Sequence, residues 1–169
     1  MSPVLETERL TLRVPDARDT NAYLAFMRSE DARMVGGPMS TQQAKVSWGT
    51  ELAHWSMHGY GRFSVVPKGE DVSVGMVGPQ HPMGWPENEL NWYFFEAGRG
   101  KGYATESARA AIAWTYATLK WPSIISYILQ TNTPSIRVAE RLGAVVDKDA
   151  ISPRKDVLTL RYPAPEVFQ

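Results

Sequence analysis

A glycine-rich segment, residues 98–107 (GRGKGYATES), combines residue types that can bind an anion. A strand is predicted to end near Phe95 and a helix to begin at Thr105, so the segment is a strand-to-helix turn. Glycines leave backbone N–H groups unshielded, and a helix N-terminus carries about half a positive charge. With Arg99 and Lys101 as counterions, the segment predicts an anion site, although glycines also occur where a chain only needs a tight turn.

Two familiar phosphate-binding loops do not fit this spacing. A Walker A loop requires Ser or Thr directly after its lysine, whereas Gly102 follows Lys101 and the hydroxyl that binds magnesium is missing. A dinucleotide-binding fingerprint requires a third glycine at the position of Tyr103. The spacing therefore excludes both a nucleoside-triphosphate loop and a Rossmann loop.

The composition is that of an ordinary globular chain. A length of 169 residues is typical of one domain, and we expect a single domain over residues 1–169. Lys plus Arg and Asp plus Glu each number 18, so no overall positive field favours nucleic acid or an anionic membrane. The chain has no cysteine and three histidines, which leaves no thiol nucleophile and predicts no metal site. The N-terminus lacks the apolar run of a signal peptide, and we expect a cytoplasmic protein.

Hydrophobic periodicity predicts helices and strands that alternate along the chain. Ser40 and Gln43 form a capping-box pair ahead of the second helix, and the Pro-rich stretch from Gly78 to Glu87 is predicted to be a loop. The predicted order is strand 9–14, helices 17–28 and 41–57, strands 62–66, 72–77 and 90–95, helix 105–120, strand 124–129, helix 134–142, and strands 144–147 and 156–162. This order predicts an α+β fold with a mixed sheet of about six or seven strands and about four flanking helices.

Four short motifs resemble those of the GNAT family of N-acetyltransferases. Residues 99–104 (RGKGYA) resemble its pyrophosphate motif, [Gln/Arg]-x-x-Gly-x-[Gly/Ala]. Residues 6–13 (ETERLTLR) and 89–92 (ELNW) resemble strands of the branch that contains the ribosomal-protein-alanine N-acetyltransferases. Residues 132–143 (NTPSIRVAERLG) resemble its late strand-to-helix motif. The motifs occur in the expected order over nearly the whole chain, and the resemblance implies the acyl-CoA N-acyltransferase fold.

The resemblance implies that acetyl-CoA is the donor and that it lies where two parallel strands splay apart. Its pyrophosphate would contact the amides of residues 100–105, and Asn132 would hydrogen-bond the pantetheine arm, although an asparagine there can also cap a helix. An amine would attack the thioester directly, which suits a chain without a cysteine nucleophile. The predicted donor-binding residues are Arg99, Gly100, Lys101, Gly102, Tyr103, Ala104, Thr105 and Asn132.

Two residues are candidates for catalysis. The resemblance implies an acid on the strand that holds Glu89, so Glu89 is the predicted base, directly or through water, with a solvated strand-end carboxylate as the alternative. His81 has a more suitable intrinsic pKa for a base but occupies no motif position. In the branch that this chain resembles, a serine three residues after the motif asparagine is the donor to the departing sulfur, and Ser135 stands there, where a capping role is the alternative. The tyrosine that many other members use is replaced by Ala139.

The acceptor is expected to be a primary amine, on a small molecule or a protein N-terminus, and the protein a monomer or homodimer. Deprotonation at pH 7 costs about 1.4 kcal/mol for an α-amine and about 4.6 kcal/mol for a lysine, so a base matters more for a lysine. The acceptor pocket is expected to be formed by the first two helices and by the 78–87 and 151–155 loops. Aromatic side chains there could hold a cation, although tryptophans at helical spacing are more often core residues. The candidates are Trp48, Trp55, Tyr60, His81 and Trp85.

Two competing functions remain open at this point. A noncatalytic acyl-CoA sensor on the same fold is motivated by Ala139 at the tyrosine position. Nucleic-acid binding through Arg99 and Lys101 is disfavoured by the zero net charge.

Overall fold

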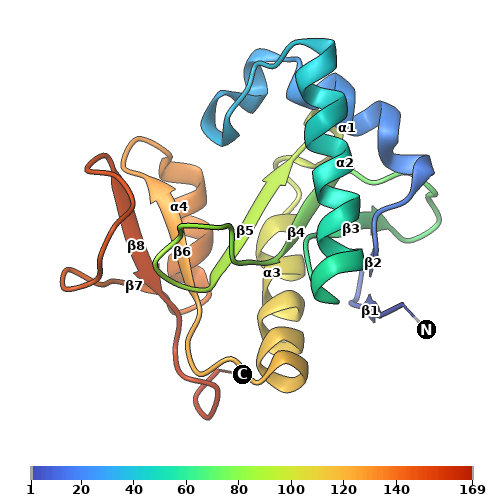
Figure 1. Cartoon of the computed structure of the whole chain (residues 1–169). Helices are drawn as coiled ribbons and strands as arrows, with labels where there is room; N and C mark the ends of the chain where they lie inside the picture. Colours follow the sequence, from blue (N-terminus) through green and yellow to red (C-terminus); the bar gives the residue numbers. More distant parts are fainter. Residues whose placement is uncertain (1, 169) are drawn as a thin grey trace.

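The computed structural model describes residues 2–168. Its strands form one mixed eight-stranded sheet (Figure 1). The order of strands across the sheet is β1-β2-β3-β4-β5-β6-β8-β7. The strands are β1 (Val4–Glu6), β2 (Leu10–Arg13), β3 (Phe63–Pro67), β4 (Gly75–Gln80), β5 (Glu89–Phe94), β6 (Ile125–Leu129), β7 (Val145–Val146) and β8 (Val157–Arg161). The predicted α+β class is confirmed, but the predicted count of six or seven strands is too low. The sequence pattern does not reveal β1, because three residues are too few to show a period; β1 forms by antiparallel pairing with β2.

The α-helices among the described residues are α1 (Thr20–Met27), α2 (Thr41–His58), α3 (Tyr103–Trp114) and α4 (Thr133–Arg141). The predicted capping box of α2 is present: the Ser40 hydroxyl accepts a bond from the Gln43 N–H at 3.1 Å, and the Gln43 side chain accepts one from the Ser40 N–H at 2.9 Å. A 3-10 helix, η2 (Glu30–Val35), joins α1 to the segment before α2. None of the helices in residues 2–168 combines the length and the hydropathy needed to cross a membrane.

The prediction of a loop from Gly78 is wrong for its first three residues, because β4 continues to Gln80. Within the strand, Gly78 lies against the backbone of Gly61, and a Cβ at position 78 would collide with the Gly61 carbonyl oxygen. Pro79 stands opposite Leu90 of β5 in the strand register. Glycine is therefore required at position 78 because another backbone segment approaches closely. From composition alone, a glycine needed for this reason looks the same as a glycine needed for a turn.

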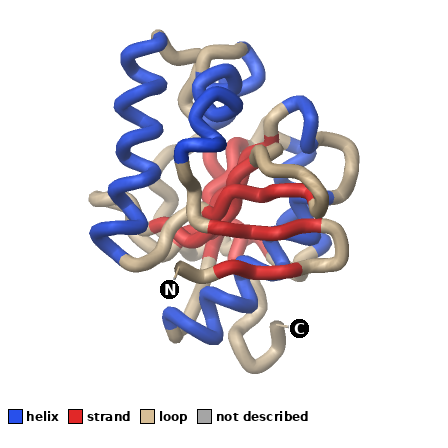
Figure 2. Tube along the Cα trace, turned by 90° about the vertical axis from the view of Figure 1, so that its right-hand side faces the viewer, coloured by secondary structure: helices blue, strands red, loops and turns tan. Residues whose placement is uncertain are grey.

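The two faces of the sheet carry separate hydrophobic cores, and helices lie on both sides of the strands (Figure 2). Helix α1 and the first half of α2 form one core, which includes Trp48, Met76 and Tyr93. Helices α3 and α4 form the other, which also receives Trp55 from the end of α2. Trp48 and Trp55 are thus core residues, as their helical spacing allows, and neither contributes an exposed aromatic surface.

The centre of the sheet is split. Strands β5 and β6 are parallel neighbours, and their registered pairing in the described chain is limited to Glu89 opposite Ile125. Beyond this pair the strands diverge, which confirms the splay that the family resemblance implies. Side chains of both strands therefore border open space in the middle of the molecule rather than a continuous hydrogen-bonded ladder.

A buried carboxylate ties α1 to the sheet. Asp19, immediately before α1, has no exposed surface and accepts bonds from both terminal nitrogens of Arg13 at 2.8 Å. It also accepts bonds from the Ser64 hydroxyl at 2.7 Å and from the Ser73 N–H at 3.1 Å. Burial alone would raise the pKa of Asp19, but the bonds from Arg13 and Ser64 outweigh it and lower the pKa below its ordinary value.

Replacing Asp19 with alanine is expected to destabilise the protein by about 3 kcal/mol, because Arg13 loses its buried partner and keeps only Asp16, at 3.2 Å, and the Asp71 carbonyl. As a control, Glu30→Ala removes an exposed ion pair to Arg33 and is expected to cost at most about 1 kcal/mol. Chemical denaturation measures both values. Since the pKa of Asp19 is lowered in the folded state, its contribution is present at neutral pH and is lost as pH falls through the folded-state pKa. A cost below about 1 kcal/mol for Asp19→Ala would contradict the buried network.

Candidate active site

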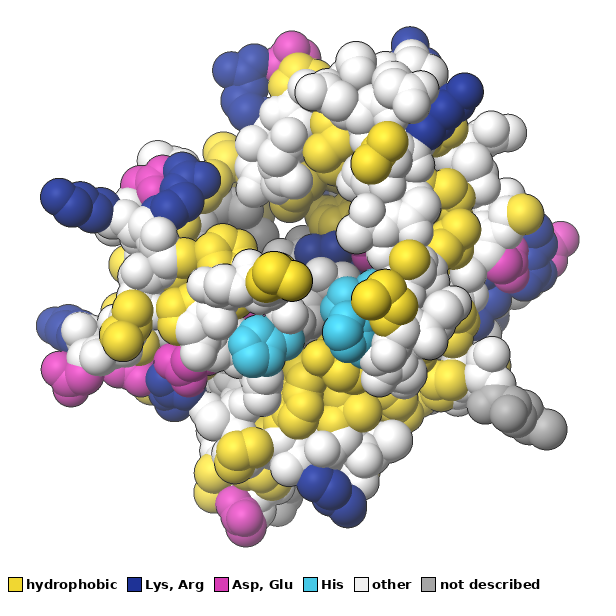
Figure 3. Space-filling model, in the orientation of Figure 1, with side chains coloured by type: hydrophobic (Ala, Val, Ile, Leu, Met, Phe, Trp, Pro, Cys, Tyr) yellow, Lys and Arg dark blue, Asp and Glu magenta, His cyan; other side chains and the backbone are white. Residues whose placement is uncertain are grey.

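Two cavities meet where β5 and β6 diverge. The first has a volume of about 640 Å³ and runs from the glycine loop to the start of α4; it is called the donor cleft after the ligand that the sequence predicts for this loop. The second has a volume of about 410 Å³ and lies between α1, α2 and the splayed strands; it is called the acceptor cavity after the ligand expected there. The face of the molecule in Figure 3 is hollowed beside α2, with hydrophobic side chains around the opening. Both cavities are lined by Met34, Val35, Trp92, Tyr93, Asn132 and Ser135.

The glycine loop has the geometry of an anion site. Gly100 and Gly102 have φ angles of 71° and 78°, the left-handed region that other residues rarely adopt, and α3 begins directly afterwards at Tyr103. The first N–H groups of a helix have no partner within it, so the amides at this turn are available to a ligand. The predicted donor-binding residues that line the cleft are Arg99, Gly100, Gly102, Tyr103, Ala104, Thr105 and Asn132. The Lys101 side chain instead lines a separate pocket beside α1.

Arg9 holds this loop in place, a role that the sequence analysis misses. Its Nη1 donates to the Lys101 carbonyl at 2.8 Å, and its Nε donates to Glu106 Oε2 at 2.7 Å. The Thr7 hydroxyl donates to the other Glu106 oxygen at 2.6 Å. Thr7 and Arg9 both belong to the ETERLTLR motif, so the resemblance of this segment was the available signal. The motif at the N-terminal end of the chain thus positions a loop about 90 residues away.

Cations also reach the donor cleft from elements other than the loop. Arg99 forms an ion pair with Asp31 of η2 at 2.8 Å, and its Nε donates to the Phe94 carbonyl at 3.0 Å. Helix α4 contributes Arg137 and Arg141, which line the cleft and which sequence reasoning did not select. Their i, i+4 spacing places them on one side of a helix and was a usable signal. The cleft therefore combines a helix N-terminus with three guanidinium groups, one of which, that of Arg99, is paired with Asp31 in the same cleft.

Asn132 and Ser135 stand at the junction of the two cavities. The Asn132 side chain caps α4, accepting a bond from the Ser135 N–H at 3.3 Å, which is the capping role that the sequence leaves open for this asparagine. Ser135 lies in the first turn of α4, is half-buried, and lines both cavities. The residue at the expected tyrosine position, Ala139, is fully buried in the core.

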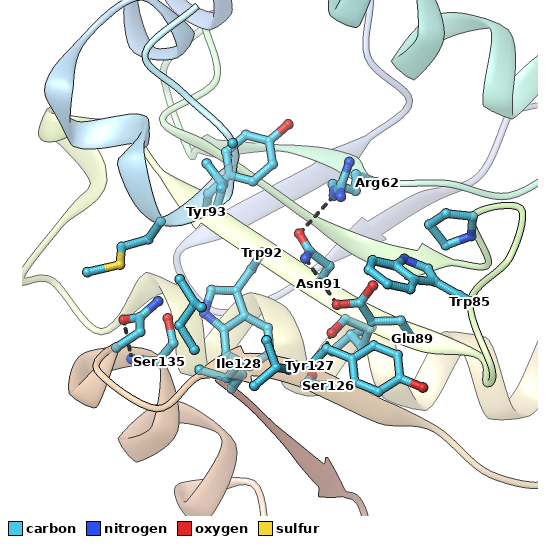
Figure 4. A pocket seen from close by; sticks show the side chains of 18 of the residues that line it. Arg62, Trp85, Glu89, Asn91, Trp92, Tyr93, Ser126, Tyr127, Ile128 and Ser135 are labelled. Atoms are coloured by element: carbon cyan, nitrogen blue, oxygen red, sulfur yellow. Dashed lines mark hydrogen bonds between the residues drawn. The ribbon is translucent and has the colours of Figure 1, made fainter. Parts of the chain in front are cut away.

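Glu89 lies in the acceptor cavity at the end of a chain of polar side chains (Figure 4). The Asn91 amide donates to Glu89 Oε1 at 3.2 Å, and Arg62 Nε donates to Asn91 Oδ1 at 3.0 Å. Arg62 forms an ion pair with Glu51 of α2 on its other side. Two-residue alternation along β5 puts Glu89 and Asn91 on the same face of the sheet. Arg62 and Glu51 come from other elements, and the linear sequence gives no sign that they join this chain.

The environment of Glu89 suits proton transfer. The residue is 4% exposed, and burial raises the pKa of its carboxyl above the ordinary value. The hydrogen bond from Asn91 and the positive charge of Arg62 offset part of that increase in the pKa. A carboxylate with a raised pKa is a stronger base than a solvated one, and its position in the cavity argues against the alternative of a solvated strand-end residue.

The wall beside Glu89 is aromatic. The rings of Trp85 and Tyr127 have centroids 5.5 Å apart, and both residues line the acceptor cavity. The other expected aromatic residues do not line it. His81 is exposed, with Nε2 3.2 Å from the Trp85 carbonyl oxygen, and Tyr60 packs against Trp121. Of the residues proposed for an aromatic acceptor site, Trp85 is therefore the one that the structure brings to the cavity.

Comparisons with known proteins agree with this geometry. A family model described as "Acetyltransferase (GNAT) domain" matches residues 9–145. The crystal structure of an acetyltransferase from Agrobacterium tumefaciens is 36% identical, with a TM-score of 0.88 over 95% of this chain and 94% of that one. A ribosomal-protein-S5-alanine acetyltransferase from Vibrio fischeri is 17% identical and shares the fold, with a TM-score of 0.75 over 99% of each chain.

A curated relative, the uncharacterized N-acetyltransferase YnaD of Bacillus subtilis, is 29% identical over 82 residues. This match spans 48% of either chain, about half the length of the relative. The family model, in contrast, covers most of the sequence, including the glycine loop, both candidate catalytic residues and the diverging strands. The chain therefore belongs to the GNAT family of acetyltransferases.

Proposed function

We propose that this protein transfers an acetyl group from acetyl-CoA directly to a primary amine, without a covalent enzyme intermediate. The observation that carries the proposal is the meeting of two cavities at Asn132 and Ser135. The donor cleft ends in cations and free helix amides, which suit the phosphates of CoA. The acceptor cavity ends at a buried carboxylate, which suits a base for an amine.

Positioning is expected to supply most of the rate enhancement. Holding an amine and a thioester in line can contribute about 7–11 kcal/mol to lowering the barrier. Asn132 and the unpaired edges of β5 and β6 would orient the pantetheine arm toward the junction. Glu89 would accept the ammonium proton, directly or through a water molecule, while Asn91 and Arg62 hold its carboxylate in place. Ser135 would donate a hydrogen bond to the departing thiolate.

The proposal is tested by measuring CoA binding and acetyl transfer on the same preparation. Calorimetry with CoA measures the affinity of the donor cleft, and a thiol-sensitive dye measures CoA release with a panel of small amines and peptides. We expect binding together with acceptor-dependent release. Binding without turnover on any acceptor would favour the noncatalytic sensor that Ala139 suggests, and absence of CoA binding would reject both functions. The cytoplasmic location expected from the sequence stays a prediction.

Replacing Ser135 with alanine is expected to lower kcat about tenfold and to leave the affinity for CoA within about twofold. The reason is that a hydrogen bond to a charged group contributes about 1.5–3 kcal/mol, whereas the α4 cap uses the Ser135 backbone N–H and survives the change. Steady-state kinetics with saturating amine measures the effect. Thr133→Ala, an exposed residue of the same turn, is the control and should retain full activity. Equal kcat values for Ser135→Ala and the parent protein would show that the Ser135 hydroxyl does not take part in catalysis.

A further inference from the structure

The charges that line the acceptor cavity restrict which amines it can take. Four charged side chains border it, and two of them neutralise each other: Glu51 is ion-paired with Arg62. Arg154, at the mouth, is ion-paired with Asp156 at 2.5 Å and is more than half exposed. Glu89 accepts hydrogen bonds from neutral groups, the Asn91 amide at 3.2 Å and the Tyr127 backbone, and forms no ion pair within residues 2–168. The cavity thus has one position for an ammonium group.

That position is framed by aromatic rings. In Figure 4, Glu89 lies between Trp85 on one side and Tyr127 on the other. An ammonium group bound at Glu89 would lie near these rings, and the face of an aromatic ring attracts a cation by about 0.5–2 kcal/mol. Trp85 comes from the loop between β4 and β5 and Tyr127 from β6, so the two sides of the split sheet both contribute to the frame.

The part of the cavity wall that faces α1 and η2 is largely apolar. Three methionines, Met27, Met34 and Met39, line it together with Tyr23 and Val35. Methionine side chains are flexible and polarisable, so they pack against apolar groups of varied shape. The same wall offers no carboxylate to a second ammonium, because Glu51 is already bound by Arg62. A second positive charge on the acceptor would therefore lose its hydration without gaining a partner.

We propose that the acceptor is a monoamine whose amino group is carried on an apolar or aromatic body, and that diamines and other polycations are rejected. This inference rests on the proposed function, since it assigns the amine to the cavity that contains Glu89. It also assigns a role to Trp85 and Tyr127, which contact the acceptor and determine its specificity.

The test uses two amines of matched size, n-pentylamine and 1,4-diaminobutane, which differ by exchange of a terminal methyl for an ammonium group. The kcat/KM of acetyl transfer is expected to be at least about tenfold higher for n-pentylamine. Affinity for the CoA-bound protein, measured by calorimetry, is expected to follow the same order. Equal values, or a preference for the diamine, would overturn the inference while leaving the proposed function intact.

The two proposals fail in distinguishable ways. If no amine of the panel is acetylated but the CoA-bound protein binds n-pentylamine at least about tenfold more tightly than 1,4-diaminobutane, the catalytic function fails while the charge preference of the cavity holds. If neither amine is bound or acetylated, the inferred acceptor preference is wrong, even if other acceptors are acetylated.

Variants of the 81–88 loop test the role of Trp85. Trp85→Ala is expected to lower kcat/KM for phenethylamine about tenfold, with CoA affinity unchanged. Met83→Ala is the matched control, because Met83 belongs to the same loop and its side chain is fully exposed. This control should stay within about twofold of the parent protein. A Trp85→Ala protein with unchanged kcat/KM for phenethylamine would contradict the assignment.

Discussion

Replacing Gly102 with glutamate is expected to lower the affinity for CoA about a hundredfold or more, equivalent to about 3 kcal/mol. Gly102 has a φ of 78° and precedes the first residue of α3, so any side chain strains the turn. A carboxylate there also opposes the negative charge of a pyrophosphate at the helix N-terminus. Calorimetric titration with CoA measures the loss.

The matched control for this variant is Gly69→Glu. Gly69 also adopts a left-handed conformation, with φ of 90°, and a Cβ there meets no atom within 4 Å, but it lies in the β3–β4 turn outside the donor cleft. Both variants add one negative charge at a glycine with positive φ, although a Cβ at position 102, unlike one at position 69, lies 3.4 Å from Arg9 Nη2. We expect Gly69→Glu to lose some stability and to keep the parent affinity for CoA. Similar affinities for the two variants would mean that the glycine loop does not bind the donor.

Replacing Glu89 with glutamine is expected to lower kcat about a hundredfold, because general base catalysis contributes about 10²–10⁴-fold. The affinity for CoA should not change, since Glu89 lines the acceptor cavity and not the donor cleft. The control is Glu87→Gln, two residues earlier, where the carboxylate is bonded to Arg161 and lines neither cavity. Initial rates at saturating acetyl-CoA measure both. Full activity of Glu89→Gln at every pH would show that another group, such as His81 or a water chain, acts as the base.

The pH dependence follows from the raised pKa of Glu89. A base must be ionised, so kcat/KM of the parent protein is expected to rise with pH through a midpoint above 4.5, the ordinary value for a glutamate. The Glu89→Gln protein should lack this titration. A second titration at higher pH, from the acceptor amine, should remain in both proteins.

The same substitution is expected to stabilise the fold at neutral and higher pH. A carboxyl whose pKa is raised by folding favours its neutral form, so the parent protein loses stability as pH rises through the folded-state pKa. Glutamine has no charge to bury and avoids that loss. We expect the Tm of Glu89→Gln to exceed that of the parent by about 2 °C or more at pH 8 and to match it below pH 4.5. A lower Tm for Glu89→Gln than for the parent protein at pH 8 would show that the Glu89 carboxylate stabilises the fold at that pH.

Local sequence signals were sufficient for the elements and for the donor loop. The capping pair Ser40 and Gln43, the glycine of the α4 terminus, Gly143, and the turn at 98–102 each fix the backbone through their own residue types. The same holds for the alternation that puts Glu89 and Asn91 on one face of β5. These features depend on neighbours within a few positions, and such neighbours are visible in a single sequence.

Contacts between distant segments could not be predicted. Arg9 reaches Lys101 and Glu106, and Arg62 joins Asn91 to Glu51, only after the sheet and both helix layers have assembled. The last three residues of β4 likewise belong to the strand through their pairing with β5, which the composition of residues 78–80 does not reveal. The roles of Glu89 and Ser135 stay predictions because they depend on the reaction. The single-domain organisation also stays a prediction.

Direct transfer across the junction of the two cavities is tested most directly by a single-turnover experiment. The protein, loaded with acetyl-CoA, is mixed rapidly with n-pentylamine, and free thiol and acetylated amine are measured in the same quenched samples. Because the chain has no cysteine nucleophile and the two cavities share Ser135, we predict that both products appear together at one rate. Thiol that appears before the acetylated amine, or without it, would contradict direct transfer.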